Sequence, residues 1–535
     1  MEQDRQRKRR TIDGFLPPGS RIPAKGPPGS GGISQPAGRP QRMLDDFRGR
    51  KDGLDSSSIQ TGQIDIPTRS AGARKSNAHL LGKRLDSYEK RKRKRRKKRI
   101  IIAVIFLAFA FFGILAAKGY LNLLKVFGGG GGAAALNENV DPSQLKVEGD
   151  GRVNILLLGR GGSGHEGPDL TDTIILVSID PIDKSAGIVS IPRDFYVNVA
   201  DYGSMKINSV FYSGKQRALS RVGSDSESTM RQAEEQGLRL TENTVEKVLG
   251  VPIHYNAIID FKGFIKAIDT VGGIDIDVPK DVSEHMRING HNYFLNVKAG
   301  PKHFDGFEAL AYSRSRYTSL RGDFDRSERQ RLVIIGLKDK ILSLGTFSNP
   351  AKISQLIDQF GNNVRTNFEF DDMNKLYSIV REINSSSVQS IGLADPPNNY
   401  LQTASVGGLS VILPVLGQSD YFDIHYYIRN TLRDSFLKQE DAAVVILNGT
   451  GRSGAAIEKA NELRSYGYKV TRIDNAPSAN YAKTMLIDMG HRDNKYTKHY
   501  LQKRLGIIAA NNLPDNTIRV GTNDFVIILG DDTSL

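Results

Sequence analysis

Ten consecutive Lys and Arg residues, at positions 90–99, stand directly before an uncharged and almost wholly apolar stretch at 100–117. At about 1.5 Å per residue, a helix over this stretch is about 27 Å long, close to the thickness of the hydrocarbon core of a bilayer. Positive charge beside a membrane helix favours the cytoplasmic side. The sequence therefore predicts a single-pass cell-membrane protein with a transmembrane signal-anchor helix over 100–120, a cytoplasmic N-terminus and extracytoplasmic domains after the helix.

The positive charge of the chain is concentrated before this predicted helix. The formal net charge is +15 over 535 residues, but residues 1–99 alone hold 27 Lys and Arg against 10 Asp and Glu. The remaining residues hold 47 Lys and Arg against 49 Asp and Glu. The predicted exported part therefore lacks the basic footprint that nucleic-acid binding requires, and we expect no nucleic-acid partner.

Residues 1–99 are rich in Gly, Pro, Ser and charged residues and contain few apolar runs. Such a segment cannot bury enough apolar surface to offset its conformational entropy, so we predict a disordered cytoplasmic tail. A short pattern of an aliphatic residue, Asp, a small or acidic residue and an aromatic residue begins at Ile12, Leu44 and Leu85. The three copies indicate either a docking motif for a cytoplasmic partner or a chance product of the biased composition.

The chain after the predicted membrane helix divides into a linker and two domains. Residues 121–149 include five consecutive Gly and predict a flexible extracytoplasmic linker. In residues 150–437, short apolar runs alternate with helix-like stretches, which is typical of an α/β fold. Residues 438–535 predict a small C-terminal α/β domain whose strand–helix–strand order implies a right-handed parallel crossover. The chain contains no Cys, which excludes disulfides and thiol catalysis.

Polar residues that suit phosphate chemistry stand at the ends of predicted elements of the larger domain. They are Asp172, Arg193, Asp194, Lys206, Asn208, Arg314 and Arg316. The planar guanidinium of Arg matches phosphate oxygens, often with two hydrogen bonds. Asp172 suits Mg²⁺, which proteins bind through one or two carboxylates together with substrate phosphates. Lys206 and Asn208 are candidates for substrate binding, and Asp194 is a candidate general base or else part of a structural salt bridge.

A predicted helix that begins near residue 323 carries charged and apolar side chains on one face. The residues that share this face are Arg326, Arg329, Gln330, Val333, Leu337 and Ile341. Their spacing of three and four residues places them on the same side of the helix. A face that changes from cationic to apolar along the helix axis suits a ligand with an anionic head and an apolar tail. The alternative is an ordinary core helix whose first turn carries solvated charge.

Together, these Arg and Asp residues indicate phosphoryl transfer through positioning and charge neutralisation. The sequence contains no Walker-type phosphate-binding loop. The motifs of residues 150–437 resemble, in order and spacing, those of the LytR-CpsA-Psr family. They are NILLLG, DTIILVSIDP, IPRDFYV, KIN, GVPIHYNAIIDFKGFIKAIDTVGGIDIDVP, AGPKHFDGFEALAYSRSR and GDFDRSERQ. The segment ILNGTGRSGAAIEKANELRSYGYKV resembles the LytR C-terminal domain that is often attached to this family.

The resemblance implies a central β-sheet flanked by helices and a magnesium-dependent phosphotransferase of cell-wall assembly. Such an enzyme moves a glycan-phosphate, for instance of a teichoic-acid-like glycopolymer, from a polyprenyl-pyrophosphate carrier to peptidoglycan, with pyrophosphate hydrolysis as a side activity. The residues implied to hold the pyrophosphate are Arg193, Arg314, Arg316, Arg326 and Arg329, with Gln330 beside them. The resemblance also implies that Asp172 binds Mg²⁺ and that an apolar cavity takes the polyprenyl chain.

One position departs from the family pattern. The family has glycine, any residue and aspartate after the first strand, and that aspartate is a second metal ligand, whereas Gly161 stands in its place here. Asp169 and His165, in the loop that follows, are candidates to replace it; otherwise the metal ion is held differently. The departure keeps a non-catalytic polyprenyl-phosphate or cell-wall binding protein open as an alternative function. The family name suggests a third function, a transcriptional attenuator.

Overall fold

The computed structural model describes residues 129–137, 139–222, 226–288, 291–316, 323–343, 363–394 and 398–533. The basic tail with its three repeated patterns, the predicted transmembrane segment and the first residues of the predicted linker lie outside these ranges. Within the described ranges, no helix combines the length and the apolar character needed to cross a membrane.

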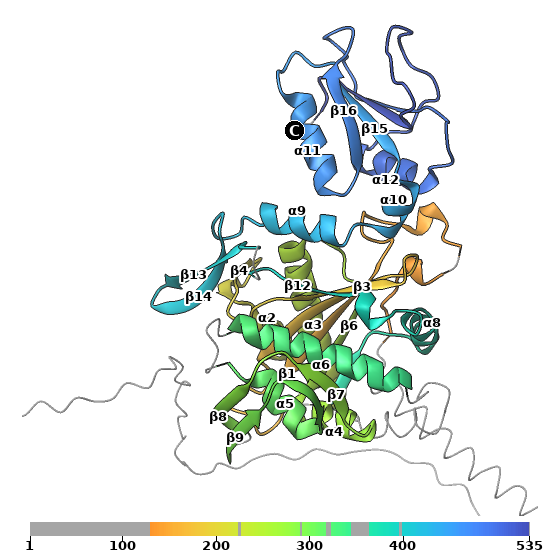
Figure 1. The fold of residues 1–535 in the computed structure, drawn as a ribbon. Coiled ribbons are helices and arrows are strands. Elements are labelled where there is room, and N and C mark those ends of the chain that lie inside the picture. Colours follow the sequence, from red (N-terminus) through yellow and green to blue (C-terminus); the bar gives the residue numbers. More distant parts are fainter. Residues whose placement is uncertain are drawn as a thin grey trace, which may run out of the picture. The chain divides into compact units, whose positions relative to one another are not determined.

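A six-stranded mixed sheet forms the centre of the larger domain (Figure 1), with the strand order β11-β6-β1-β2-β3-β12. Its strands are β1 (Val153–Arg160), β2 (Thr171–Asp180), β3 (Ser185–Ser190), β6 (Tyr255–Asp260), β11 (Val364–Thr366) and β12 (Val388–Gly392). β1 pairs with β2 in antiparallel and with β6 in parallel orientation. The continuous apolar runs predicted for β1 and β2 are confirmed, because a sheet covered on both faces favours apolar residues at successive positions.

Alternate residues of β1 and β2 point to different hydrophobic cores. Leu156 and Leu176 belong to a first core, on one face of the sheet. Val153 and Ile155 belong to a second core, on the opposite face. The first core contains residues of α2 (Val210–Val222), α3 (Glu227–Leu249) and α9 (Phe422–Thr431). Residues of α8 (Phe370–Val380) pack against the second. The predicted arrangement of a central sheet flanked by helices is therefore confirmed.

Helices and hairpins form a third core beside the sheet. They are α4 (Phe261–Thr270), α5 (Gly306–Arg314), α6 (Asp323–Ser343), the pair β7 (Ile274–Val278) and β10 (Gly300–Phe304), and the hairpin β8 (Val282–Ile288) and β9 (His291–Val297). Asp260 caps α4 by accepting a hydrogen bond from the Gly263 backbone, and Asp305 forms a capping box with Glu308 at α5. Local sequence thus determines where these two helices begin.

Helix α3 pairs with α2. The two helices approach closely at Gly214 and Gly237, where a Cβ added to Gly214 would lie 2.9 Å from the Gly237 Cα. Small residues at this contact therefore allow the two helices to pack closely.

The C-terminal domain is a separate α/β unit with the strand order β16-β15-β18-β17. Its elements are β15 (Ala443–Asn448), α11 (Ala455–Ser465), β16 (Lys469–Asn475), β17 (Met485–Asp488), α12 (Lys495–Leu505) and β18 (Phe525–Leu529). β15 and β16 are parallel and are connected through α11, as predicted. The short helix α10 (Ser435–Glu440) precedes this unit.

The prediction of a flexible linker over residues 121–149 is wrong for its described part. Ala135 and Leu136 are buried against the central sheet, and Leu145 is fully buried in the core of the C-terminal domain. The Gly131 backbone donates a hydrogen bond to the Asn367 carbonyl. Apolar residues after the glycine run therefore order this segment, which composition alone did not indicate.

Candidate functional site

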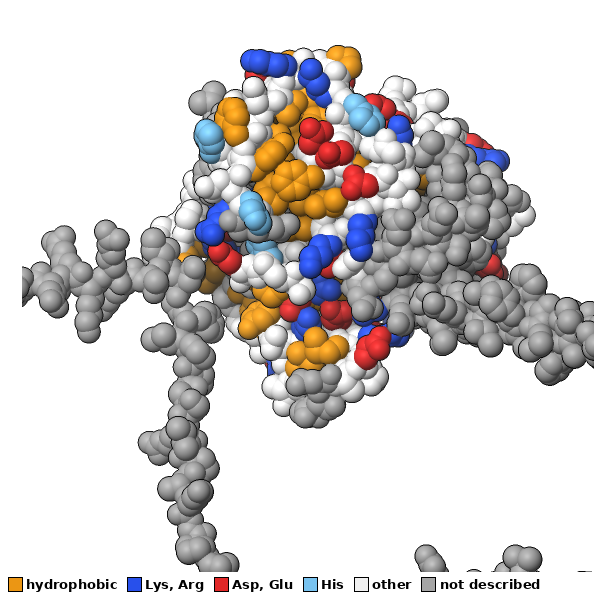
Figure 2. Space-filling model, turned by 90° about the horizontal axis from the view of Figure 1, so that it is seen from below, with side chains coloured by type: hydrophobic (Ala, Val, Ile, Leu, Met, Phe, Trp, Pro, Cys, Tyr) orange, Lys and Arg blue, Asp and Glu red, His pale blue; other side chains and the backbone are white. Residues whose placement is uncertain are grey.

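A cavity of about 940 Å³ lies between the central sheet, the helices α4, α5 and α6, and the hairpin β8–β9. Figure 2 shows the face of the molecule that carries these elements, with hydrophobic side chains gathered at its centre and charged side chains around them. The cavity has an apolar and a polar part. The apolar part includes Leu157, Ile175, Ala257, Ile259, Phe264, Val271, Met286, Leu310, Val333, Leu337 and Ile341.

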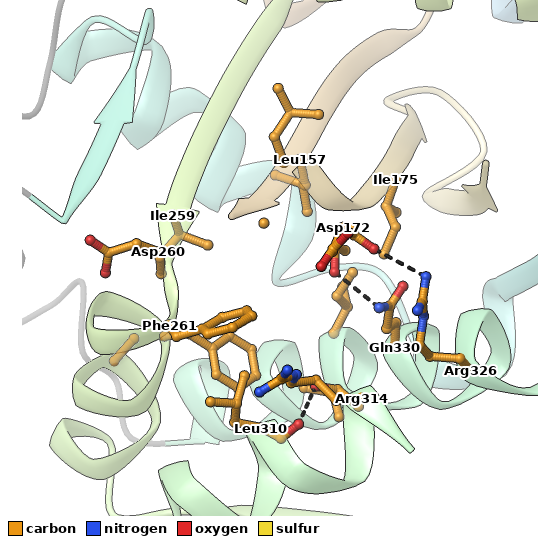
Figure 3. Close-up of a pocket in the computed structure, with 18 of the residues that line it drawn as sticks. Leu157, Asp172, Ile175, Ile259, Asp260, Phe261, Leu310, Arg314, Arg326 and Gln330 are labelled. Carbon is orange, nitrogen blue, oxygen red and sulfur yellow. Dashed lines mark hydrogen bonds between the residues drawn. The ribbon is translucent and has the colours of Figure 1, made fainter. Parts of the chain in front are cut away.

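The polar part of the cavity contains six of the predicted polar site residues. They are Asp172, Arg193, Arg314, Arg316, Arg326 and Gln330. The Nη1 atom of Arg193 lies 2.9 Å from the Oδ1 atom of Asp172. Arg326 donates a hydrogen bond to the Asp172 carbonyl, and Gln330 donates one to the Thr173 hydroxyl (Figure 3). The structure thus brings predicted site residues of β2 and α6 together in one cavity.

Helix α6 presents the predicted face to this cavity. Arg326 and Gln330 line the polar part, while Val333, Leu337 and Ile341 line the apolar part. Arg329 differs from this expectation, because it is buried beside the cavity and donates a hydrogen bond to the Ser315 carbonyl. It therefore supports the backbone between Arg314 and Arg316 instead of facing the cavity.

Three other predicted residues stand in a layer next to the cavity. Lys206 pairs with Asp194 at 2.7 Å, and Asp194 also lies 3.6 Å from the Nε of Arg193. The Asn208 side chain amide lies 3.5 Å from the Asp172 carboxylate. These contacts connect all three residues to the Arg193–Asp172 pair, and they place Asp194 in an ion pair beside the cavity.

The charges of the polar part favour an anionic ligand. Burial raises the pKa of Asp172, but the charge and hydrogen bond of Arg193 outweigh this effect and leave the pKa below its ordinary value. Burial lowers the pKa of Arg314, Asp172 raises it, and the nearby charges of Arg193 and Arg316 lower it further. The buried Arg314 Nη1 has no hydrogen-bond partner among the described residues. A ligand oxygen would satisfy this donor and neutralise the surrounding cations.

The guanidinium of Arg314 is held by an aromatic ring. Its central carbon lies 4.7 Å from the centroid of Phe261, the first residue of α4 (Figure 3). A cation–π contact orients a planar guanidinium without using its N–H donors. The donors of Arg314 thus stay available for a ligand in the cavity.

The residues around Asp172 fit a magnesium ion only partly. Asp172 is a suitable carboxylate ligand, but no group of three or more His, Asp or Glu side chains that could hold a metal ion occurs in the described ranges. Asp169 does not line the cavity, and its two carboxylate oxygens accept hydrogen bonds from Arg160 and Lys215. The structure thus offers no support for Asp169 as the partner of Asp172 at a metal ion.

Gly161 is surrounded by its own loop. A Cβ at this position would lie 2.5 Å from the His165 ring, so a larger residue requires a different loop conformation. His165 Nδ1 accepts a hydrogen bond from the Gly167 backbone. The centroids of the His165 and Phe261 rings lie 5.3 Å apart, and the two rings are almost perpendicular. His165 therefore has a clear packing role and does not line the cavity.

The sequence matches the LytR_cpsA_psr family over residues 131–410, which is more than half of the chain. The chain belongs to this family. Residues 441–532 match a second family, described as LytR cell envelope-related transcriptional attenuator, and coincide with the C-terminal domain.

Two curated proteins illustrate the similarity of this LytR_cpsA_psr protein to its relatives. It is 28% identical over 450 residues to the cell wall biosynthesis protein LcpA of Corynebacterium glutamicum, covering 76% of the chain and 83% of LcpA. It is 34% identical over 237 residues to the polyisoprenyl-teichoic acid–peptidoglycan teichoic acid transferase TagV of Bacillus subtilis, covering 43% of the chain and 54% of TagV. The crystal structure of TagV matches with 28% identity and a TM-score of 0.39, over 54% of this chain and 98% of the crystallised TagV chain.

This family member has two cavity residues that sequence reasoning missed. Glu284 on β8 is buried, lines the cavity and accepts a hydrogen bond from the Arg316 backbone at 2.8 Å. Asp260 lines the cavity at the start of α4. The alternation of apolar and polar residues in β8 offered a signal for Glu284, since Val282, Glu284 and Ile288 are buried on one side of the strand.

Proposed function

We propose that this protein moves a glycan-phosphate from a polyprenyl-pyrophosphate carrier to peptidoglycan at the outer face of the cell membrane. The observation that carries this proposal is a single cavity with Arg and Asp residues in one part and aliphatic residues in the other. Membership of the LytR_cpsA_psr family and the transferase name of TagV point to the same reaction. The predicted membrane segment beside a basic run supports a carrier that reaches the site from the lipid phase.

The substrate divides between the two parts of the cavity. Arg193, Arg314 and Arg326 neutralise the pyrophosphate and hold it by directed hydrogen bonds, while the aliphatic part takes the first section of the polyprenyl chain. Charge neutralisation and positioning account for most of the catalysis in phosphoryl transfer, because the protein needs to form no covalent bond itself. A set of Arg residues that stays charged at all physiological pH values suits this task.

The proposed reaction conserves atoms and charge. A hydroxyl oxygen of the peptidoglycan acceptor attacks the phosphorus that carries the glycan and forms a new phosphodiester bond. The bond from this phosphorus to the bridging oxygen breaks, and polyprenyl monophosphate leaves with that oxygen. The hydroxyl proton passes to a base, for which Asp194 is our candidate, with Lys206 and Arg193 holding its orientation.

Asp172 is the residue that would hold Mg²⁺ in this reaction. A bound magnesium ion would supply additional positive charge at the pyrophosphate oxygens. The remaining ligands would be substrate oxygens and water, since Asp172 is the predicted ligand that faces the cavity. Arg193 and Asn208 fix the orientation of the Asp172 carboxylate.

The test is a transfer assay with the purified full-length protein, Mg²⁺, a radiolabelled polyprenyl-pyrophosphate disaccharide and peptidoglycan oligomers. We expect label in peptidoglycan together with polyprenyl monophosphate, and a loss of about 100-fold or more in the Arg326→Ala variant. Arg239→Ala, which changes an exposed residue of α3, is the matched control and should transfer normally. Carrier binding without cleavage or transfer would instead support the non-catalytic binding protein, and cleavage by water alone would reduce the proposal to a pyrophosphatase.

A further inference from the structure

Five charged side chains form a buried cluster near the polar part of the cavity. The members of this charge cluster are Arg160, Asp169, Lys215, Glu234 and Arg365. Asp169 lies 3.0 Å from Arg160 and 2.8 Å from Lys215. Glu234 lies 2.9 Å from Arg160, 2.9 Å from Arg365 and 3.6 Å from Lys215. Each carboxylate therefore bridges at least two cations.

The cluster is shielded from solvent. The exposed fractions of the side chains are 9% for Arg160, 14% for Asp169, 7% for Lys215, 10% for Glu234 and 18% for Arg365. Burying charges costs free energy that close pairing only partly offsets, so such clusters are a poor way to gain stability alone. Three cations face two carboxylates, which makes the loss of either carboxylate especially unfavourable.

The charge cluster connects five segments, of which β1 and β11 also contribute residues to the cavity. Arg160 ends β1, Asp169 lies in the loop between β1 and β2, Lys215 and Glu234 lie on α2 and α3, and Arg365 lies on β11. Gly159 and Val364, the neighbours of Arg160 and Arg365, line the cavity. The cluster itself does not line it. Its members therefore do not contact a ligand in the cavity, but they hold backbone that leads into the cavity wall.

The loop between β1 and β2 explains why this backbone needs to be held. Residues 161–170 contain four Gly, and the β1–β2 pairing is irregular between Gly159 and Arg160. Such a loop has high conformational entropy and does not by itself determine where β2 begins. Arg160 stands opposite Thr171 in the sheet and binds Asp169, so this ion pair closes the loop directly before Asp172.

We propose that the charge cluster is a positioning device that holds Asp172 at the pyrophosphate, and that Asp169, Lys215 and Glu234 are positioning residues for the transfer reaction. This inference rests on the proposed function and deepens it. Asp169 precedes Asp172 by three positions in the chain and acts through this short connection, and Lys215 and Glu234 act through Asp169 and Arg160. A positioning role also explains why Asp169 lies in the charge cluster and does not line the cavity.

The experiment must separate positioning from simple stabilisation of the sheet. A second buried ion pair, Arg152 with Asp180 at 3.1 Å, lies at the opposite ends of the same strands β1 and β2. Its side chains are 6% and 0% exposed. Asp180→Asn is therefore a matched control that weakens the same sheet far along the strands from Asp172.

The test measures kcat, KM for the polyprenyl-pyrophosphate disaccharide and the melting temperature of full-length Lys215→Met, Glu234→Gln, Asp169→Asn and Asp180→Asn proteins. We expect all four melting temperatures to fall. In the three charge-cluster variants we expect kcat to fall about 10- to 100-fold with KM changed much less, because a small displacement of the reacting groups is enough to slow the reaction. Asp180→Asn should keep the kcat of the wild type.

Two results would overturn the proposal. One is a kcat that falls in proportion to the melting temperature in all four variants, which indicates stability alone. The other is a loss of kcat in Asp169→Asn without loss in Lys215→Met or Glu234→Gln, which indicates that Asp169 acts directly, for instance on a metal ion.

A rescue variant keeps the test decisive if the neutral variants fold poorly. Asp169→Glu retains the carboxylate and should recover most of the kcat that Asp169→Asn loses, whereas no recovery in a folded protein contradicts the proposal. An inactive wild-type protein would refute the proposed function itself. A transfer-active wild type with unaffected charge-cluster variants would refute only the positioning role.

Discussion

At the scale of single residues, the site depends on the guanidinium of Arg314, whose Nη1 has no hydrogen-bond partner among the described residues. Arg314 is half-buried, packs on Phe261 and lines the cavity. Burial lowers the pKa of its guanidinium, Asp172 raises it, and the charges of Arg193 and Arg316 lower it. Such a group is stabilised when an anion binds. Its planar shape matters as much as its charge, because the ring of Phe261 sets the plane of the guanidinium.

This arrangement predicts that a lysine cannot replace Arg314. We expect Arg314→Lys to keep the charge but to lower kcat/KM for carrier cleavage about 10- to 100-fold, since an ammonium loses both the stacking on Phe261 and the bidentate contact. The measurement is steady-state release of polyprenyl monophosphate. The equivalent exchange at the exposed Arg239 should change little, and a fully active Arg314→Lys variant would show that charge alone is sufficient.

The ionisation of Asp172 predicts a specific dependence of stability on pH. Burial raises the pKa of this carboxyl, but Arg193 lowers it more and leaves it below the ordinary value of 3.8. The charged form therefore stabilises the folded protein above this value, and the contribution is lost as pH falls through the lowered pKa. In urea denaturation we expect Asp172→Asn to be less stable than the wild type near neutral pH. This difference should shrink below pH 3.8, and a constant difference would contradict the assignment.

At the scale of elements, α6 places the two parts of the cavity in line. The same helix face carries Arg326 and Gln330 near the Asp172 end and Val333 and Leu337 further along. A head group fixed at the first turn therefore directs an attached chain along the helix. The hairpin β8–β9 and helix α4 provide the opposite walls.

The apolar half of α6 predicts discrimination by chain length. Burying an aliphatic side chain against a ligand contributes about 1.5–3 kcal/mol. We therefore expect Leu337→Asn to weaken binding of a long-chain polyprenyl pyrophosphate by at least about tenfold and to leave a short-chain analogue unaffected. Isothermal titration with both ligands is the measurement. Asp339→Asn, on the exposed side of the same helix, should bind both as the wild type does.

The face of α6 could be predicted because its signal is local. Helical spacing alone places Gln330 and Val333 on the same face of the helix, one turn apart. In the structure, both residues line the cavity. The surroundings of Asp169 could not be predicted, because its partner Lys215 is 46 residues away in sequence. Arg329 shows a further limit: helical spacing assigns a residue to a face, but the neighbouring carbonyl of Ser315 draws its side chain away from the cavity.

At the scale of the whole molecule, the proposed reaction requires the folded domains and the peptidoglycan to be on the same side of the membrane. The basic run at 90–99 and the apolar stretch at 100–117 predict this topology. In intact cells, we expect external protease to remove a C-terminal tag and to leave an N-terminal tag until lysis. A protected C-terminal tag in intact cells would contradict both the topology and the transferase, and would favour the attenuator.

The size of the cavity has a consequence for how such an enzyme would turn over. At about 940 Å³, the cavity is at the upper end of the range for sites that enclose drug-sized ligands. A polyprenyl chain long enough to anchor a glycan in a bilayer is larger than such a ligand. On the proposed function, the distal part of the lipid would therefore remain in the membrane throughout the reaction. The polyprenyl monophosphate product would then return directly to the bilayer that already holds the distal part of its chain. This release avoids the free-energy cost of transferring a complete lipid into water.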